Sequence, residues 1–284
     1  MSKVPLRAFA VLVALFLVVP AFIVVPLSLS DSQFLRFPPP GWSTRWYTEF
    51  FNDPEWTGAL WRSLRVATGA MLVAMLVGLA ASYALVRGKR RFLTWCEPLM
   101  LLPMMVPIIV FGAGAYIVAL SMRLVGSLWV LMLAQAVLAL PYVVLNLTAA
   151  MRTTDERLEL VAQSLGASRF TAFRTVLLPL VMPAVVGAGL IAFALSLDEA
   201  VMALFLAGDT SPTLPAKMYT SIRYDLNPLV PTGATIMIGI SLVLLVLLVL
   251  IQRQSARRGR RTAGSDGASS PLSPTQPSTT PIEA

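Results

Sequence analysis

Six stretches of this sequence are nearly free of charged residues and are each long enough to cross a lipid bilayer. A helix needs about 20 consecutive apolar residues to span the hydrocarbon core, whereas a transmembrane strand would show roughly 10 residues of alternating polarity. These runs are longer and continuously apolar, and 57% of the chain is hydrophobic. The sequence therefore predicts an all-α membrane protein with six transmembrane helices, at about 8–30, 66–86, 98–122, 124–150, 176–200 and 232–252.

The basic residues predict which way these helices cross the membrane. With the N-terminus in the cytoplasm, fifteen of the 22 lysine and arginine residues fall on the cytoplasmic side and seven on the other. The positive-inside rule then places both termini and the segment 152–174 in the cytoplasm, as expected for a multi-pass protein of the bacterial inner membrane. Nucleic-acid binding is a poor alternative, because the basic residues follow one membrane face rather than a folded domain.

Several residue types that carry chemistry are missing. The chain has no histidine and one cysteine, Cys96, so imidazole metal sites and an intrachain disulfide are excluded. No Walker A glycine-lysine motif occurs, so any nucleotide has to be bound by another chain. We expect neither catalytic residues nor a metal site here, and the chain is not predicted to be an enzyme.

Two segments outside the spans have distinctive compositions. Residues 42–56 are rich in tryptophan, tyrosine and phenylalanine, which predicts anchoring at the lipid headgroups or, alternatively, contact with an extracytoplasmic partner. Residues 253–284 are first arginine-rich and then rich in serine, threonine, proline and glycine. We expect this tail to be disordered, with its arginines attracted to anionic lipid.

The segment 152–174 is amphipathic, which a simple connection between two spans does not require. Thr153 and Glu156 have the spacing of a capping box, so a short helix is predicted to begin there. Four apolar residues then recur at helical spacing and share one face: Leu158, Val161, Ala162 and Leu165.

The same segment contains a predicted hinge. Gly166 can adopt the left-handed conformation that ends a helix, and Ser168 is placed to cap a second short helix through Phe170. Pro179 follows near the start of the next span, where its missing amide costs little. The sequence therefore predicts helix, hinge and helix before the membrane is entered again.

This pattern resembles the EAA loop of ABC-importer permeases. The positions in register are Ala162, Gly166, Val176, Leu178 and Pro179. Leu160 and Val161 stand where that motif has Glu and Ala, although Glu159 lies one place earlier. The stretches 193–199 and 214–228 are similar to the second permease subunit of spermidine/putrescine-type importers.

The resemblance implies a type I ABC importer permease (MetI-like) architecture, with a membrane domain over 1–252 and a cytoplasmic tail over 253–284. It also implies an ABC ATPase dimer that binds ATP and Mg, a second homologous permease and an extracytoplasmic substrate-binding protein. In that family the short helix of the loop docks in a groove of the ATPase. The residues that this assigns to ATPase coupling are Leu158, Glu159, Val161, Ala162, Leu165, Gly166, Ala167, Phe170 and Pro179.

Asp198 and Glu199 are the candidate substrate-path residues. They lie between two apolar runs, and carboxylates at membrane depth usually face a cavity, a partner or a cationic ligand. A polyamine is such a ligand; the alternative is that both residues pair with arginine or with backbone groups at a helix end. Other cargoes, such as an opine, a sugar or ferric iron, stay open, as does the different class of a passive channel or structural membrane protein.

Overall fold

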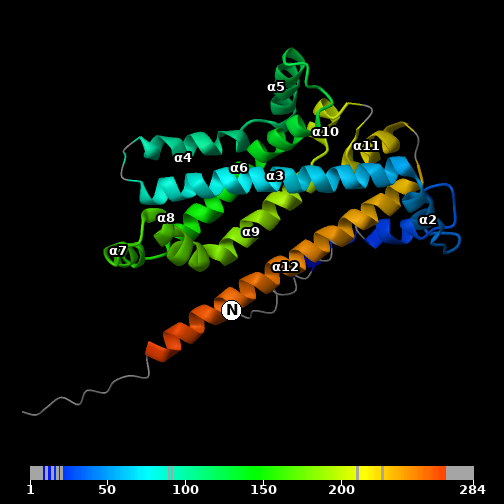
Figure 1. Cartoon of the computed structure of the whole chain (residues 1–284). Coiled ribbons are helices and arrows are strands. Elements are labelled where there is room, and N and C mark those ends of the chain that lie inside the picture. Colours follow the sequence, from blue (N-terminus) through cyan, green and yellow to red (C-terminus); the bar gives the residue numbers. More distant parts are fainter. Residues whose placement is uncertain are drawn as a thin grey trace, which may run out of the picture.

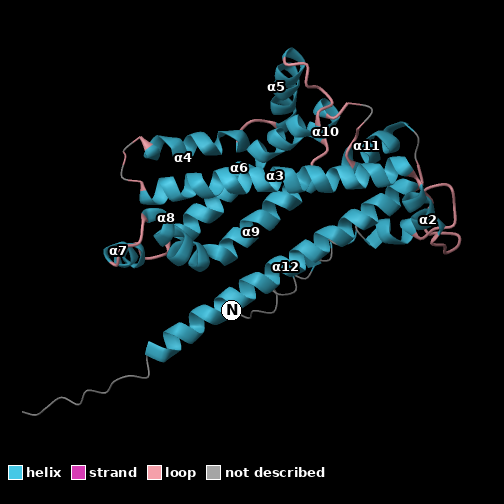
Figure 2. Ribbon diagram, viewed as in Figure 1, coloured by secondary structure: helices cyan, strands magenta, loops and turns pink. Residues whose placement is uncertain are grey.

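The structure, a computed structural model, describes residues 22–88, 90, 92–208, 211–224 and 227–266, together with positions 9, 12, 13, 16 and 19. Side chains are described as far as residue 252, except that of residue 94. Within these ranges the regular elements are helices joined by loops (Figure 2), and one isolated bridge pairs Ser30 with Trp42. The predicted all-α class is therefore confirmed.

Three long helices form the centre of the molecule. They are α3 (Pro54–Arg87), α6 (Leu128–Arg152) and α9 (Leu178–Leu197), and α12 (Leu229–Asp266) crosses beside α9 (Figure 1). Small residues let the helices approach closely, as is usual in membranes. A Cβ added at Gly78 of α3 would lie 2.5 Å from Cγ1 of Val143 on α6. The other small buried residues at this junction are Ala70, Ala74, Ala136, Ala139, Ala188 and Ala192.

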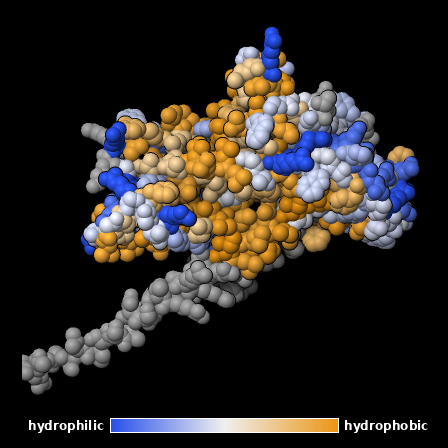
Figure 3. Space-filling model, viewed as in Figure 1, coloured by the Kyte–Doolittle hydropathy of each residue, from blue (hydrophilic) through white to orange (hydrophobic). Residues whose placement is uncertain are grey.

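Four helices of the described chain are long and apolar enough to cross a membrane, and a bent pair makes a fifth if it counts as one span. Apolar residues cover the middle of the face seen in Figure 3, and polar residues gather at both ends. Of the predicted first span, 8–30, residues 22–28 are helical and most of the others lie outside the described residues. The straight candidates are Pro54–Arg87, Leu128–Arg152, Arg169–Leu197 and Leu229–Gln252.

The prediction of one continuous helix over 98–122 is wrong. The chain instead forms α4 (Leu93–Leu101), a 3-10 turn (Leu102–Met104) and α5 (Ile108–Ser121), with a bend of 97° before α5. Pro103 and Pro107 explain the break, because proline lacks an amide donor and its ring clashes with the preceding turn of an α-helix. Pro107 has an extended ψ of 131° and directly precedes α5.

Short helices gather at the two ends of the long ones (Figure 1). α2 (Arg45–Asn52) and α11 (Leu214–Tyr224) lie beside the start of α3, while α7 (Arg157–Ser164) and α8 (Arg169–Ala172) lie at its far end. α10 (Val201–Leu206) packs against α5 near the middle. The predicted amphipathic loop and the aromatic segment therefore occupy opposite ends of the molecule.

The aromatic segment is only partly the surface anchor that its composition predicts. Trp46, Phe50 and Trp56 are buried in a core cluster with the first turns of α12, whereas Trp42 and Phe51 are exposed. α2 is amphipathic, and Trp46 and Phe50, four residues apart, lie on its inward face. Half of this segment thus stabilises the end of the bundle.

The C-terminal boundary also differs from the prediction. The expected span ends at 252 and a disordered tail follows, but α12 continues as a helix to Asp266. Residues 253–262 are mostly arginine, alanine and glutamine, which are strong helix formers. The tail over 267–284 lies outside the described residues.

Candidate coupling helix and solute cavity

α7 begins three residues later than a capping box at Thr153 and Glu156 requires, so that prediction is wrong. Thr153 closes the C-terminal end of α6 instead, where its hydroxyl donates to the Ala150 carbonyl at 2.8 Å. Asp155 takes over the start of α7, because its Oδ1 accepts from the Arg157 amide at 2.9 Å. The start of α7 is thus capped by Asp155, two residues before Arg157, rather than by a reciprocal pair.

The predicted apolar face of α7 is open to solvent. The exposed fractions are 47% for Leu158, 58% for Val161 and 84% for Leu165, and Ala162 is half-buried. Phe170 of α8 is 72% exposed on the same part of the molecule. Exposed apolar side chains are ordinary where lipid covers them, but this surface lies at the polar end of the bundle, where a protein partner is the usual cover.

Gly166 adopts the predicted left-handed conformation, with φ of +93°. The turn is a Schellman motif, because the Ala167 amide donates to the Ala162 carbonyl and the Gly166 amide to Gln163. Ser168 then caps α8 as predicted, accepting from the Thr171 amide at 3.1 Å. No other group lies within 4 Å of a Cβ built on Gly166, so a substitution there would strain the backbone alone.

Pro179 is the second residue of α9, as its spacing predicts. The helical run is continuous from α8 into α9, so proline would clash with the carbonyl four residues earlier. A π-helical turn over Phe173–Leu177 widens the backbone at that position. The widened turn lets the chain keep its helical path through Pro179.

Glu159, which the sequence assigns to the ATPase-coupling surface, faces the interior of the protein and not the exposed apolar face of α7. It is 3% exposed, and its Oε1 lies 2.7 Å from Nε of Arg87, the last residue of α3. Nη2 of Arg87 also donates to the Thr154 carbonyl at 3.2 Å. The side chain of Glu159 therefore joins α7 to the bundle and is not available to a docking partner.

A cavity of about 230 Å³ opens between α6, α9 and the broken α4–α5 segment. Its walls are mostly apolar, and its polar groups come from two helices and from the connection to α10. This volume lies below the roughly 300–1,000 Å³ of sites for drug-sized ligands, so the chain alone offers room for a small or slender solute. The lining residues are Pro103, Met104, Val106, Ile108, Gln135, Leu138, Ala139, Tyr142, Leu195, Ser196 and Glu199.

Glu199 brings a carboxylate to this cavity. Its Oε2 accepts from the Met202 amide at 2.8 Å, which caps α10, and from Nε2 of Gln135 at 3.4 Å. The hydroxyl of Ser196 in turn donates to Oε1 of Gln135, and both of these residues are buried. Among the residues that the structure describes, no cation pairs with Glu199.

Asp198 does not join its neighbour. It lies in a separate groove against α11 and α12, among side chains that include Met218, Met237 and Leu242. α9 ends at Leu197, and the two side chains that follow line different hollows, Asp198 this groove and Glu199 the cavity. The predicted pair of adjacent carboxylates is therefore split between two sides of α9.

The sequence did not identify the other polar residues of the cavity, Gln135, Tyr142 and Ser196. One signal was present: Gln135 is an amide inside a charge-free run, where a polar side chain needs a partner. Its partners lie 61 and 64 positions further along the chain. Residue spacing within one helix could not have predicted that Gln135 contacts these partners.

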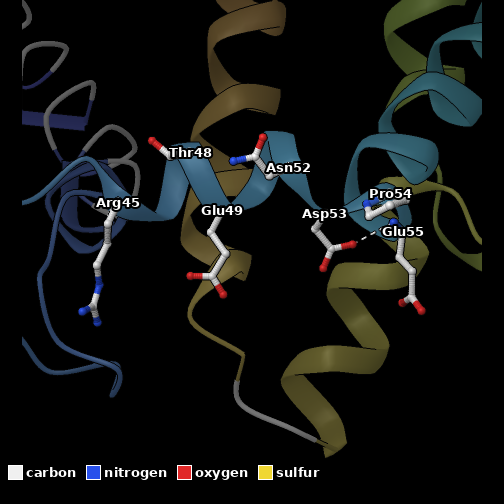
Figure 4. Close-up of a pocket in the computed structure, with 7 residues that line it drawn as sticks. All are labelled: Arg45, Thr48, Glu49, Asn52, Asp53, Pro54 and Glu55. Atoms are coloured by element: carbon white, nitrogen blue, oxygen red, sulfur yellow. Dashed lines mark hydrogen bonds between the residues drawn. The ribbon is translucent and has the colours of Figure 1, made fainter.

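A larger hollow, of about 830 Å³, lies where α2 meets α3, at the end of the molecule opposite α7. Figure 4 shows Glu49, Asp53 and Glu55 pointing to the same side of this junction. Asp53 caps α3 through the amides of Glu55 and Trp56, and Glu55 pairs with Nζ of Lys217 at 2.6 Å. Two of the three carboxylates thus already have structural partners.

Known transport proteins resemble this chain along most of its length. The spermidine/putrescine transport system permease protein PotC of Haemophilus influenzae is 32% identical over 86% of this chain and 95% of its own length. PotC of Escherichia coli K12 is 30% identical over 81% and 87%. The putrescine transport system permease protein PotI of the same strain is 30% identical over 79% and 82%.

Solved ABC transporters share the fold. A bacterial transporter that imports the acidic polysaccharide alginate matches with a TM-score of 0.66 at 13% identity, over 90% of this chain and 96% of that one. The MetNI methionine transporter matches with a TM-score of 0.52 at 19% identity, over 72% and 94%. Residues 70–261 match the family described as the inner membrane component of binding-protein-dependent transport systems. The chain belongs to this family and is an ABC importer permease, a multi-pass inner membrane protein.

Proposed function

We propose that this permease carries polyamines such as putrescine and spermidine into the cytoplasm. The observation that carries the proposal is Glu199, a carboxylate in a mainly apolar cavity with no cationic partner among the described residues. An ammonium group would supply the missing positive charge, and the apolar walls suit the methylene chain between two amines. The names of the relatives at 30–32% identity point to the same class of cargo.

The fold itself does not fix the cargo. The alginate transporter has a similar fold, yet an acidic polysaccharide would meet repulsion from Glu199. Sugars, which are neutral, would gain nothing from an unpaired carboxylate. Charge complementarity therefore supports a cationic solute over the anionic and neutral alternatives.

In this proposal an ATPase dimer drives transport from the α7–α8 end. The exposed face of Leu158, Val161 and Leu165 would be removed from water by docking in a groove of that partner. The excess of basic residues supports a cytoplasmic location for this end and for both termini. ATP and Mg bind the ATPase, and this chain makes no covalent change to its cargo.

A second, related permease and an extracytoplasmic binding protein complete the proposed importer. The binding protein would deliver the cargo at the α2 end, opposite the ATPase. The cavity beside Glu199 would be open alternately to each side as the two permeases move.

Uptake of labelled putrescine into proteoliposomes, with the complete importer reconstituted, tests the cargo. Glu199→Gln keeps an oxygen that can accept from the Met202 amide, so it removes the charge and leaves the α10 cap. We expect uptake to fall by about tenfold or more, since hydrogen bonds to charged groups contribute about 1.5–3 kcal/mol. Normal uptake by Glu199→Gln, or no putrescine uptake by the wild-type complex, would overturn the proposal. Asp198→Asn is the matched control, because it neutralises the adjacent carboxylate outside the cavity.

A further inference from the structure

α7 is attached to the rest of the protein in an unusual way. The structure describes this helix in full, and Glu159 is its one buried residue. The neighbours Leu158, Leu160 and Val161 are all more than 45% exposed, at 47%, 53% and 58%. Most short amphipathic helices are held by an inward apolar face, whereas this one turns its apolar residues outward and a single carboxylate inward.

The partner of that carboxylate is the end of α3. Nε of Arg87 lies 2.7 Å from Oε1 of Glu159, and the two side chains are only 10% and 4% exposed. The same guanidinium holds the connection between α6 and α7 through the Thr154 carbonyl at 3.2 Å. One arginine thus binds both the helix and the segment that leads into it.

A second residue of α3 contacts the same region. Tyr83 lies one turn before Arg87 on the same helix face. Its hydroxyl is 3.5 Å from Oε2 of Glu159, and its ring meets the ring of Phe173 edge-on at 4.9 Å between centroids. The last turn of α3 therefore contacts α7 and the π-helical turn that leads into α9.

α3 in turn is packed tightly against the helices that line the cavity. Gly78 lies in close contact with Val143 of α6, and Ala74 shares a buried cluster with Ala139 and with Ala192 of α9. Ala139 also lines the cavity beside Glu199. A displacement of α3 would therefore reach the cavity wall through close-packed contacts.

We propose that Arg87 and Glu159 are positioning residues that transmit movement of α7 to α3 and hence to the solute cavity. The proposal rests on the proposed function, since it requires an ATPase that engages the outer face of α7. A buried ion pair suits this role because separating its charges is costly and its geometry is directional. The apolar face receives the force, and the ion pair on the other side of the same helix passes it on.

The test compares transport with hydrolysis in the reconstituted complete importer. Labelled putrescine uptake and ATP hydrolysis are measured for Glu159→Gln, and recovery of the ATPase with the purified permease reports assembly. We expect assembly to persist and the putrescine imported per ATP to fall by about fivefold or more, the lower range for energetically coupled sites. The reversed pair, Arg87→Glu with Glu159→Arg, should restore part of that ratio.

A matched control is available on the same side of the molecule. Arg152 and Glu97 form an ion pair of similar length, 2.8 Å, but their side chains are 57% and 30% exposed. Arg152→Gln should leave the ratio unchanged within about twofold, because exposed pairs hold little energy.

Two outcomes would overturn the inference. In one, Glu159→Gln imports as much putrescine per ATP as the wild type; in the other, it lowers assembly while the assembled complexes keep the normal ratio. Failure of the proposed function looks different: the wild type would import no putrescine, or Val161→Ser on the outer face would retain both ATPase recovery and the normal ratio.

Discussion

Glu159 and Glu199 are both turned into the protein, yet their surroundings differ in one decisive respect. Glu159 has a guanidinium at 2.7 Å, so its charge is matched within the chain. Glu199 accepts from an amide of the backbone and an amide of Gln135, and no cation of the described chain pairs with it. The matched carboxylate joins two helices, whereas the unmatched one has the charge that the proposed cationic cargo requires.

The largest effect should follow from removing the arginine that distinguishes the two sites. Arg87→Leu leaves Glu159 buried without its cation, which costs about 3–5 kcal/mol in comparable pairs. We expect a clearly lower midpoint temperature for loss of the folded permease in detergent. The double variant Arg87→Leu with Glu159→Leu should regain most of the lost stability, because apolar side chains of similar volume replace such pairs well. Equal thermal stability of Arg87→Leu and the wild type would mean that Glu159, like Glu199, does not depend on a cationic partner.

The double variant also separates stability from coupling. It restores a packed contact between α7 and α3 but removes the directional ion pair. If the matched carboxylate only stabilises the fold, the double variant will transport normally; if it transmits movement, putrescine imported per ATP will stay low.

The next largest effect is expected at the unmatched site. Glu199→Gln should lower uptake by roughly tenfold to hundredfold, the equivalent of about 1.5–3 kcal/mol. Its thermal stability should change little, since glutamine still accepts from the Met202 amide. Loss of stability with normal uptake would reverse the roles of the two glutamates. Arg87→Leu should therefore mainly change thermal stability, and Glu199→Gln should mainly change uptake.

The features that sequence predicted correctly depend on near neighbours. The turn at Gly166 and the cap at Ser168 follow from the conformational freedom of glycine and from a hydroxyl three residues before an amide. The apolar runs likewise predicted helices because length and composition act locally. For the same reason the proline-rich stretch 98–107 contained the signal for a broken helix, although its apolar content pointed to a continuous one.

The features that the sequence did not predict depend on which way a side chain or a helix face points. Periodicity places Leu158 and Leu165 on one face of α7 but does not say whether that face turns in or out, so it could not show that Glu159 is the inward residue. Asp198 and Glu199 are adjacent in the chain, but their side chains line different hollows at the end of α9. The substrate-path and coupling roles of these residues stay predictions until transport is measured.

A smaller effect is expected at the turn that ends α7. Gly166 has φ of +93°, and a left-handed conformation costs residues with a Cβ about 1–2 kcal/mol. Gly166→Val should therefore shift α7 and lower putrescine imported per ATP, while membrane insertion is retained. Gly166→Asn is the control, since asparagine tolerates this conformation better. Equal coupling in the valine variant would mean that the orientation of α7 does not depend on this turn.

The smallest effect is expected at the exposed ion pair of Arg152 and Glu97. This pair tests whether burial of an ion pair determines its importance. This pair is nearly as short as that of Arg87 and Glu159, at 2.8 Å, but solvent reaches both side chains. Exposed pairs contribute about 0–1 kcal/mol, so Arg152→Gln should leave thermal stability and transport close to those of the wild type. The measurement is the same thermal scan, repeated at high salt, where screening should remove what difference remains. A loss as large as that of Arg87→Leu would show that charge pairing, rather than burial of the pair, sets the importance of Glu159.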